Sequence, residues 1–251
     1  MDKLWLPRFA DFIAVGALTL LLCSAIYAPD DGGYRFVLAA LGLCAIPVRS
    51  RFGYGVLLLI AFDGVLSGLY SSNPKLLGII HSCVVSAVVS ASVACAVWVR
   101  DSSVKNVIVL EDAGTPSLRS LSVFAGFSLA AQIILGASFR REAIPVIPHI
   151  IGAMLVAAIV LYLVMAVFMQ YSTFRELKIP SIMLTGLIGT QVLLGVGAFL
   201  NKIGQPVLAL PPQFFSAAHI VTGSLTMAMT VVLAMRISRH TYTPARVAVS
   251  A

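Results

Sequence analysis

The sequence predicts an all-α integral membrane protein in which eight transmembrane helices form two pseudo-symmetric four-helix bundles. Hydrophobic residues make up 59% of its 251 residues and charged residues only 11%, whereas a soluble domain carries about a quarter charged residues. The apolar segments are long and do not alternate with a period of two, which favours helices over a membrane β-barrel. Short motifs also recur between segments, which indicates internal repetition.

Eight apolar segments are candidates for helices that cross a bilayer, which takes about 20 residues each. The second segment is the weakest candidate, because it is short and carries Pro47 near its end. In chain order, the predicted helices cover residues 8–28, 33–49, 52–70, 75–99, 119–139, 144–171, 179–200 and 212–236.

One long polar connection, from Arg100 to Arg119, divides the chain. We therefore expect residues 1–100 to form an N-terminal four-helix half and residues 119–236 a C-terminal four-helix half. Residues 101–118 would be a cytoplasmic linker between them, and residues 237–251 a flexible polar tail.

The net charge of +7 is better explained by membrane topology than by nucleic-acid binding. Lys and Arg occur in short clusters between apolar segments and form no basic stripe with interleaved aromatic residues. With eight spans and an internal N-terminus, 12 of the 17 Lys and Arg residues fall on the inner side. The chain is therefore predicted to be a multi-pass protein of the inner (cytoplasmic) membrane, with the lipid bilayer as solvent and both termini cytoplasmic.

The cysteines give no sign of a metal site or a disulfide. All of them lie inside apolar segments, and no pair has the CxxC spacing, so we predict neither zinc nor a disulfide. They are Cys23, Cys44, Cys83 and Cys95.

A repeated motif places histidines in two helices of the C-terminal half. Gln132-Ile-Ile-Leu-Gly136 in the fifth predicted helix is echoed by Gln191-Val-Leu-Leu-Gly195 in the seventh. Each of these helices is followed by one with a histidine near its start, which is His149 in the sixth helix and His219 in the eighth. The fourth helix carries His81 at a matching position.

These histidines are expected to share one depth in the membrane. Each lies about five to seven residues, or roughly 7–11 Å, inside a helix that begins on the outer side. Counting back from the outer ends of the odd-numbered helices brings three further polar side chains to about the same level. They are Asp63, Gln132 and Gln191. Polar groups in hydrocarbon are costly and usually functional, so this layer is the predicted site.

Two histidines at equal depth on different helices of one bundle suit axial ligation of a heme iron. One imidazole nitrogen binds the metal, while the other is free to hydrogen-bond to a neighbour. We therefore predict a heme b (iron protoporphyrin IX) with His149 and His219 as metal ligands and Gln132 and Gln191 beside it. Cationic side chains favour the heme propionates. Those expected at the outer rim are Arg140, Arg141 and Lys202.

A structural role is the alternative for each of these residues. A lone intramembrane histidine or glutamine is often only a hydrogen-bonding contact between helices. For His81 the two interpretations stay open, because the second helix offers no histidine partner. A carboxyl as deep as Asp63 should be neutral or paired, and His81 is the expected partner. His240, on the predicted tail, is expected to be solvated.

From about residue 121 to 235, the glutamine–glycine segments and the histidines that follow them resemble those of the heme A synthases. That resemblance implies a heme b cofactor on His149 and His219 and a substrate heme O in the N-terminal half. His81 would hold heme O and Asp63 would orient it while a methyl group is oxidised to the formyl of heme A. The implied partners are a heme O synthase and a terminal oxidase that receives heme A.

The sequence departs from that family in the N-terminal half. The start of the second helix carries neither the family's glutamate nor its histidine–arginine pair, which leaves Asp30, Asp31 or Asp63 to replace the carboxylate. A non-catalytic b-type membrane cytochrome or heme-handling assembly factor is therefore the second hypothesis. A bundle without a cofactor, or a small transporter with a polar midplane, is the third.

Overall fold

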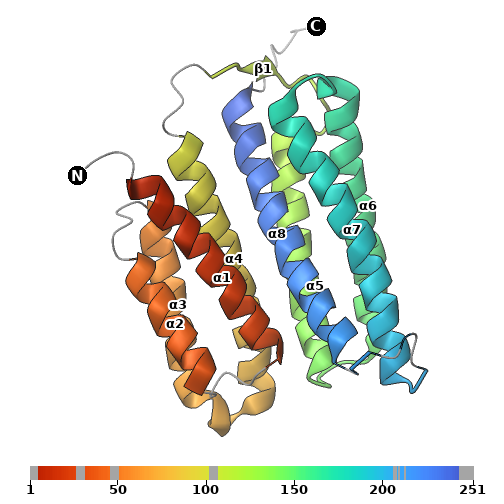
Figure 1. Ribbon diagram of the computed structural model, residues 1–251. Helices are drawn as coiled ribbons and strands as arrows, with labels where there is room; N and C mark the ends of the chain where they lie inside the picture. The colour runs from red at the N-terminus through yellow and green to blue at the C-terminus, as the bar shows by residue number, and fades with distance from the viewer. Residues whose placement is uncertain are drawn as a thin grey trace, which may run out of the picture.

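The computed structural model describes residues 5–26, 32–45, 51–101, 107–205, 208, 210–211 and 213–242. Eight α-helices make up most of this part of the chain (Figure 1). They are α1 (Trp5–Ile26), α2 (Gly32–Ala45), α3 (Arg51–Leu69), α4 (Pro74–Asp101), α5 (Leu118–Arg140), α6 (Val146–Tyr171), α7 (Arg175–Lys202) and α8 (Phe214–His240). A short 3-10 helix, η1 (Tyr70–Ser72), precedes α4, and two short strands are β1 (Leu110–Glu111) and β2 (Thr241–Tyr242).

The prediction of an all-α membrane protein is confirmed, and a helix is found at each predicted position. Six helices, α3 to α8, are long and apolar enough to cross a bilayer. In α1 and α2 the described apolar stretches are shorter, Ala10–Leu22 and Gly32–Leu43.

The helices pack in two groups of four. In each group, successive helices lie side by side and the first also packs against the fourth, so α2 lies diagonally across from α4 and α6 diagonally across from α8. Contacts of α4 with α8 and α5, and of α1 with α8, join the groups. The turns before α4, α6 and α8 all lie at the lower end in Figure 1. The N-terminal ends of these three helices, near which the intramembrane histidines lie, are therefore at the same end of the molecule.

Each group has its own apolar core, while large apolar side chains also face outward. Val88 and Val89 of α4 are fully buried in the first core, and Val160 and Leu163 of α6 in the second. The outward-facing Met169 remains 79% exposed. Further exposed residues of this kind, all at least half exposed, include Phe127, Met154, Leu193 and Phe36. An apolar surface this extensive fits a chain surrounded by lipid.

The predicted flexible tail is wrong at its start. Helix α8 continues to His240, and β2 follows it and pairs in parallel with β1 of the linker. His240 is buried rather than solvated, with only 7% of its surface exposed, and its Nδ1 donates to the carbonyl of Ile108 at 2.9 Å. Because the linker folds back over the end of α8, the chain there is held by hydrogen bonds. Residues 243–251 of the predicted tail lie outside the described residues.

Candidate functional site

The two histidines of the C-terminal half meet in the interior of their bundle. His149 begins the second turn of α6, and His219 has the corresponding place in α8, on the diagonally opposite helix. Their ring centroids are 6.2 Å apart and the ring planes are nearly perpendicular, at 86°. Both side chains are half-buried. The structure therefore brings together the two residues that the sequence predicts as a ligand pair.

A glutamine from the preceding helix contacts each histidine. The Gln132 amide on α5 donates to Nδ1 of His149 and to the His149 carbonyl, both at 2.9 Å. His219 donates from Nδ1 to the backbone carbonyl of Gln191 at 3.1 Å, and its Nε2 accepts from the Gln191 side-chain amide at 3.2 Å. In both pairs the glutamine Oε1 is buried and has no hydrogen-bond partner in the described part of the chain. Buried polar atoms are normally paired, so these two oxygens could each accept a further hydrogen bond at the level of the histidines.

The hydrogen bonds also decide which ring nitrogen is free to bind a metal. The bond from Nδ1 of His219 to a backbone carbonyl places the proton on Nδ1 and the lone pair on Nε2. The Gln191 side-chain amide donates to that lone pair, so it must turn away before Nε2 can bind a metal. In His149 the Gln132 amide donates to Nδ1, so metal binding through Nε2 requires the proton to move to Nδ1. The buried Oε1 of Gln132 can accept that proton when the amide group turns over.

Glycines make the close approach of these side chains possible. A Cβ at Gly136 or at Gly195 would lie 3.0 Å from Cε1 of His149 or His219, respectively. A Cβ at Gly223 would lie 3.0 Å from the Gln191 amide nitrogen, and one at Gly152 would collide with Gln132. These four glycines thus give room to the imidazoles and to the glutamine amides.

The cationic residues predicted at the outer rim point to two different places. Phe139 stacks on His149 with centroids 6.1 Å apart, and Lys202 Nζ lies 4.2 Å from the Phe139 ring centroid. Arg140, the last residue of α5, is exposed near this end of the bundle.

Arg141 extends toward the N-terminal half instead. Its Nη1 donates to the hydroxyl of Tyr70 at 2.6 Å, and its guanidinium lies against Gly78, where a Cβ would come within 2.5 Å of Cζ. The absence of a side chain at Gly78 lets the guanidinium lie closely against α4. A role for Arg141 beside a propionate is therefore not supported by its contacts.

In the N-terminal half, Asp63 and His81 form the predicted pair. The distance between Asp63 Oδ1 and His81 Nδ1 is 2.8 Å, and both residues are at most 2% exposed. The hydroxyl of Tyr34 donates to the other carboxylate oxygen. The pairing of Asp63 with His81 is confirmed, whereas Asp30 and Asp31 lie outside the described residues.

Tyr34 is the site residue that sequence reasoning missed. It belongs to α2 and lies diagonally across the bundle from His81 of α4, as His149 of α6 lies across from His219 of α8. The Tyr34 and His81 rings meet edge to face with centroids 5.1 Å apart. Nε2 of His81 is buried and has no hydrogen-bond partner among the described residues. The signal available in the sequence was the place of Tyr34 at the start of the second helix.

Comparisons with known proteins give no independent guide. No protein-family model matches the chain, and a search of curated proteins finds no similar sequence. The function is therefore inferred from the geometry of the two histidine sites.

Proposed function

We propose that the chain is a heme-binding membrane oxidoreductase resembling the heme A synthases, with a heme b held between His149 and His219. The observation that carries this proposal is the 6.2 Å separation of the two imidazole centroids on diagonally opposite helices. Metal–imidazole bonds are about 2 Å long, so two ring nitrogens on one metal place the ring centroids about 6 Å apart. Perpendicular rings are compatible with this, because each imidazole can rotate about its own metal–nitrogen bond.

The number of protein ligands favours heme over a bare metal ion. Within the part of the chain that the structure describes, no three His, Cys, Asp or Glu side chains come together to hold a metal ion. The neighbours of His149 and His219 include glutamine amides and Phe139, which are not usual ligands of transition metals. A bare ion such as zinc takes about four ligands, whereas heme iron brings four of its own and needs only the two imidazoles.

The chain's own residues would orient the cofactor. The Gln132 side chain at Nδ1 of His149 and the Gln191 backbone carbonyl at Nδ1 of His219 would fix ring direction and ligand basicity. Arg140 and Lys202 are near the outer end of the bundle, where acidic propionates would favour them. The bound iron would supply the redox chemistry.

The proposal also covers the number of membrane spans and the orientation of the chain. We place eight spans in the inner membrane as two pseudo-symmetric four-helix bundles, with both termini in the cytoplasm. The same order of helix packing in both groups supports this. Further support comes from glutamine or aspartate side chains of α3, α5 and α7 that contact the histidine of the next helix.

In a heme A synthase-like reaction, His81 would bind the substrate heme O and Asp63 would hold the His81 ring. The buried, unpaired Nε2 of His81 supports that role. Tyr34 must move aside first, because its ring lies against the imidazole at 5.1 Å. A heme O synthase would then be the upstream partner, and a terminal oxidase would receive heme A.

The second candidate is a non-catalytic b-type membrane cytochrome or heme-handling assembly factor. The observation that favours it is the network of Tyr34, Asp63 and His81, which occupies the place where a second pair of ligands would be needed. In that case the N-terminal half is a structural partner of one heme-binding half.

A pyridine hemochrome assay on the purified protein tests the proposal by giving the type and number of hemes per chain. His149→Ala and His219→Ala should each abolish a low-spin heme spectrum, while His240→Ala, at the other end of α8, should preserve it. An unaltered spectrum in either site variant would reject this ligation. Co-expression with a source of heme O then separates the two candidates, since ample holoprotein without heme A rejects the synthase.

A further inference from the structure

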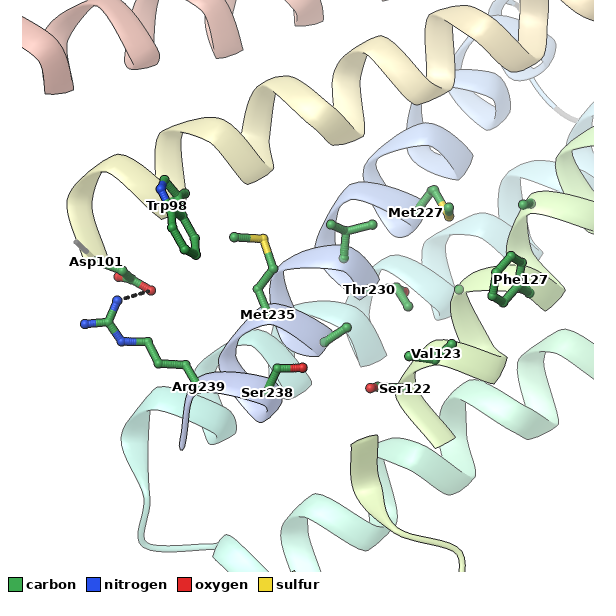
Figure 2. A pocket seen from close by; sticks show the side chains of 14 residues that line it. Trp98, Asp101, Ser122, Val123, Phe127, Met227, Thr230, Met235, Ser238 and Arg239 are labelled. Carbon is green, nitrogen blue, oxygen red and sulfur yellow. Dashed lines mark ion pairs between the residues drawn. The ribbon is translucent and has the colours of Figure 1, made fainter. Parts of the chain in front are cut away.

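A large cavity lies between α4, α5 and α8, at the opposite end of the bundle from the histidines (Figure 2). Its volume is about 680 Å³, within the range of about 300–1,000 Å³ typical of pockets for small organic ligands. Met227 is the lining residue of α8 nearest in sequence to His219. The two are eight residues apart, or about 12 Å along the helix. The cavity is therefore separate from the proposed heme site.

The cavity has a polar end and an apolar end. Asp101, Ser238 and Arg239 line the polar end, and Phe127 and Met227 lie at the other end in Figure 2. Small residues of α5 and α8 also line the cavity, so the helix surfaces leave room there. They include Gly126, Ala130 and Ala234. This gradient fits an amphiphile with a small polar head and an apolar chain.

The charges at the polar end are already balanced. The Asp101 carboxylate contacts Arg236 at 3.2 Å and Arg239 at 3.7 Å, and Arg236 also contacts Glu176 at 2.5 Å. Two cations and two carboxylates leave no net positive charge to bind a phosphate headgroup. A neutral head that both donates and accepts hydrogen bonds is better matched, because a carboxylate, a guanidinium and the Ser238 hydroxyl are all in the lining.

An aromatic side chain completes this end. Trp98 of α4 lines the cavity next to the ion pair of Asp101 with Arg239, and the Met235 side chain points toward it from α8 in Figure 2. A flat ring can pack against an indole and a thioether, which favour aromatic neighbours.

We infer that this cavity binds an isoprenoid quinone or quinol. The ring lies between Trp98 and Met235, and the isoprenoid chain follows the small residues of α5 and α8. Arg239 and Ser238 can donate to the oxygens of a quinone, and a quinol hydroxyl can also donate to the Asp101 carboxylate. This site goes beyond the proposed heme function and does not depend on it.

Trp98 provides a direct test, since the chain has only two tryptophans. In a Trp5→Phe background, Trp98 fluorescence is titrated with decylubiquinone in detergent, with and without heme. Saturable quenching at one quinone per chain is expected, and it should not depend on heme occupancy. Failure of the heme proposal therefore leaves this result unchanged.

A matched pair of glycine variants controls for partition of the quinone into detergent. A Cβ at Gly126 or at Gly186 meets nothing within 4 Å, but only Gly126 lines the cavity. Gly126→Leu should weaken quinone binding about tenfold or more by filling the cavity, and Gly186→Leu on α7 should leave it within about twofold. Ala234→Phe fills the cavity from α8 and should weaken quinone binding as much as Gly126→Leu does. It replaces Gly126→Leu in the experiment if that variant does not fold.

Two results would overturn the inference. One is quenching that rises linearly and equally in all variants, which is simple partition. The other is saturable binding of decylubiquinone that is reversed by phosphatidylglycerol but not by ubiquinol-type headgroups without a chain. That result would identify a phospholipid site.

Discussion

The imidazole rings of His149 and His219 lie 6.2 Å apart across the interior of the C-terminal bundle, although the two residues are 70 positions apart in sequence and belong to diagonally opposite helices. Each ring passes over a glycine of the neighbouring helix, Gly136 for the first and Gly195 for the second. The separation of the rings is therefore set by helix surfaces that carry no side chain at these two points.

Adding a methyl group at either glycine should displace the histidine. In Gly136→Ala and Gly195→Ala the new Cβ would lie 3.0 Å from the imidazole Cε1, and overpacking of this kind costs about 1–3 kcal/mol. We expect hemin affinity to fall about tenfold, measured by titrating the Soret band of the apoprotein. Gly189→Ala, where a Cβ meets nothing within 4 Å, is the control. Equal affinity in all three variants would show that the imidazole positions do not matter.

Removing the Tyr34 ring should open the N-terminal site. Its contact with His81 at 5.1 Å leaves no room for a macrocycle between the two residues. We expect wild-type protein to bind one hemin per chain and Tyr34→Ala to bind a second one. The double variant Tyr34→Ala, His81→Ala should return to one. A second hemin that persists without His81 would exclude this histidine as the ligand.

Asp63 should be a stability determinant as well as a site residue. Asp63→Ala leaves the His81 Nδ1 and the Tyr34 hydroxyl buried without their acceptor, which costs about 3–5 kcal/mol by analogy with a broken buried pair. Thermal unfolding in detergent measures the loss. Asp11→Ala, which removes an exposed ion pair with Arg100, should cost less than about 1 kcal/mol. Similar losses in the two variants would contradict a buried Asp63 network.

The charge bias predicts the topology. With both termini in the cytoplasm, a fluorescent protein fused after Ala251 should fluoresce and alkaline phosphatase fused there should be inactive. Phosphatase fused after Glu142, in the turn between α5 and α6, should be active. The reverse pattern would show that the bundle is inserted the other way up.

Helix positions and the depth of polar residues could be predicted from the sequence because the bilayer sets both. Segment length follows from membrane thickness, and distance along a helix follows from its rise. These two rules brought Asp63 and His81 to one level, and the structure pairs them at 2.8 Å.

Rotation of the helices and side-chain reach could not be predicted in the same way. Tyr34 escaped notice because an aromatic residue in an apolar helix usually packs in a core, and only its hydrogen bond to Asp63 distinguishes it. Arg141 is long enough to reach either half, and the absence of a side chain at Gly78 decides its direction. The burial of His240 depends on the linker, which is more than a hundred residues away in sequence.

The pairing of β1 with β2 has a practical consequence for protein engineering. Asp112 donates its backbone N–H to Tyr242 at 2.8 Å, and its carboxylate accepts the N–H of Leu118 at the start of α5. The segment from Val107 to Tyr242 thus has its two ends fastened together. Domains with adjacent ends tolerate circular permutation and insertion, so this segment is a natural cassette to excise, permute or graft, carrying both His149 and His219 with it.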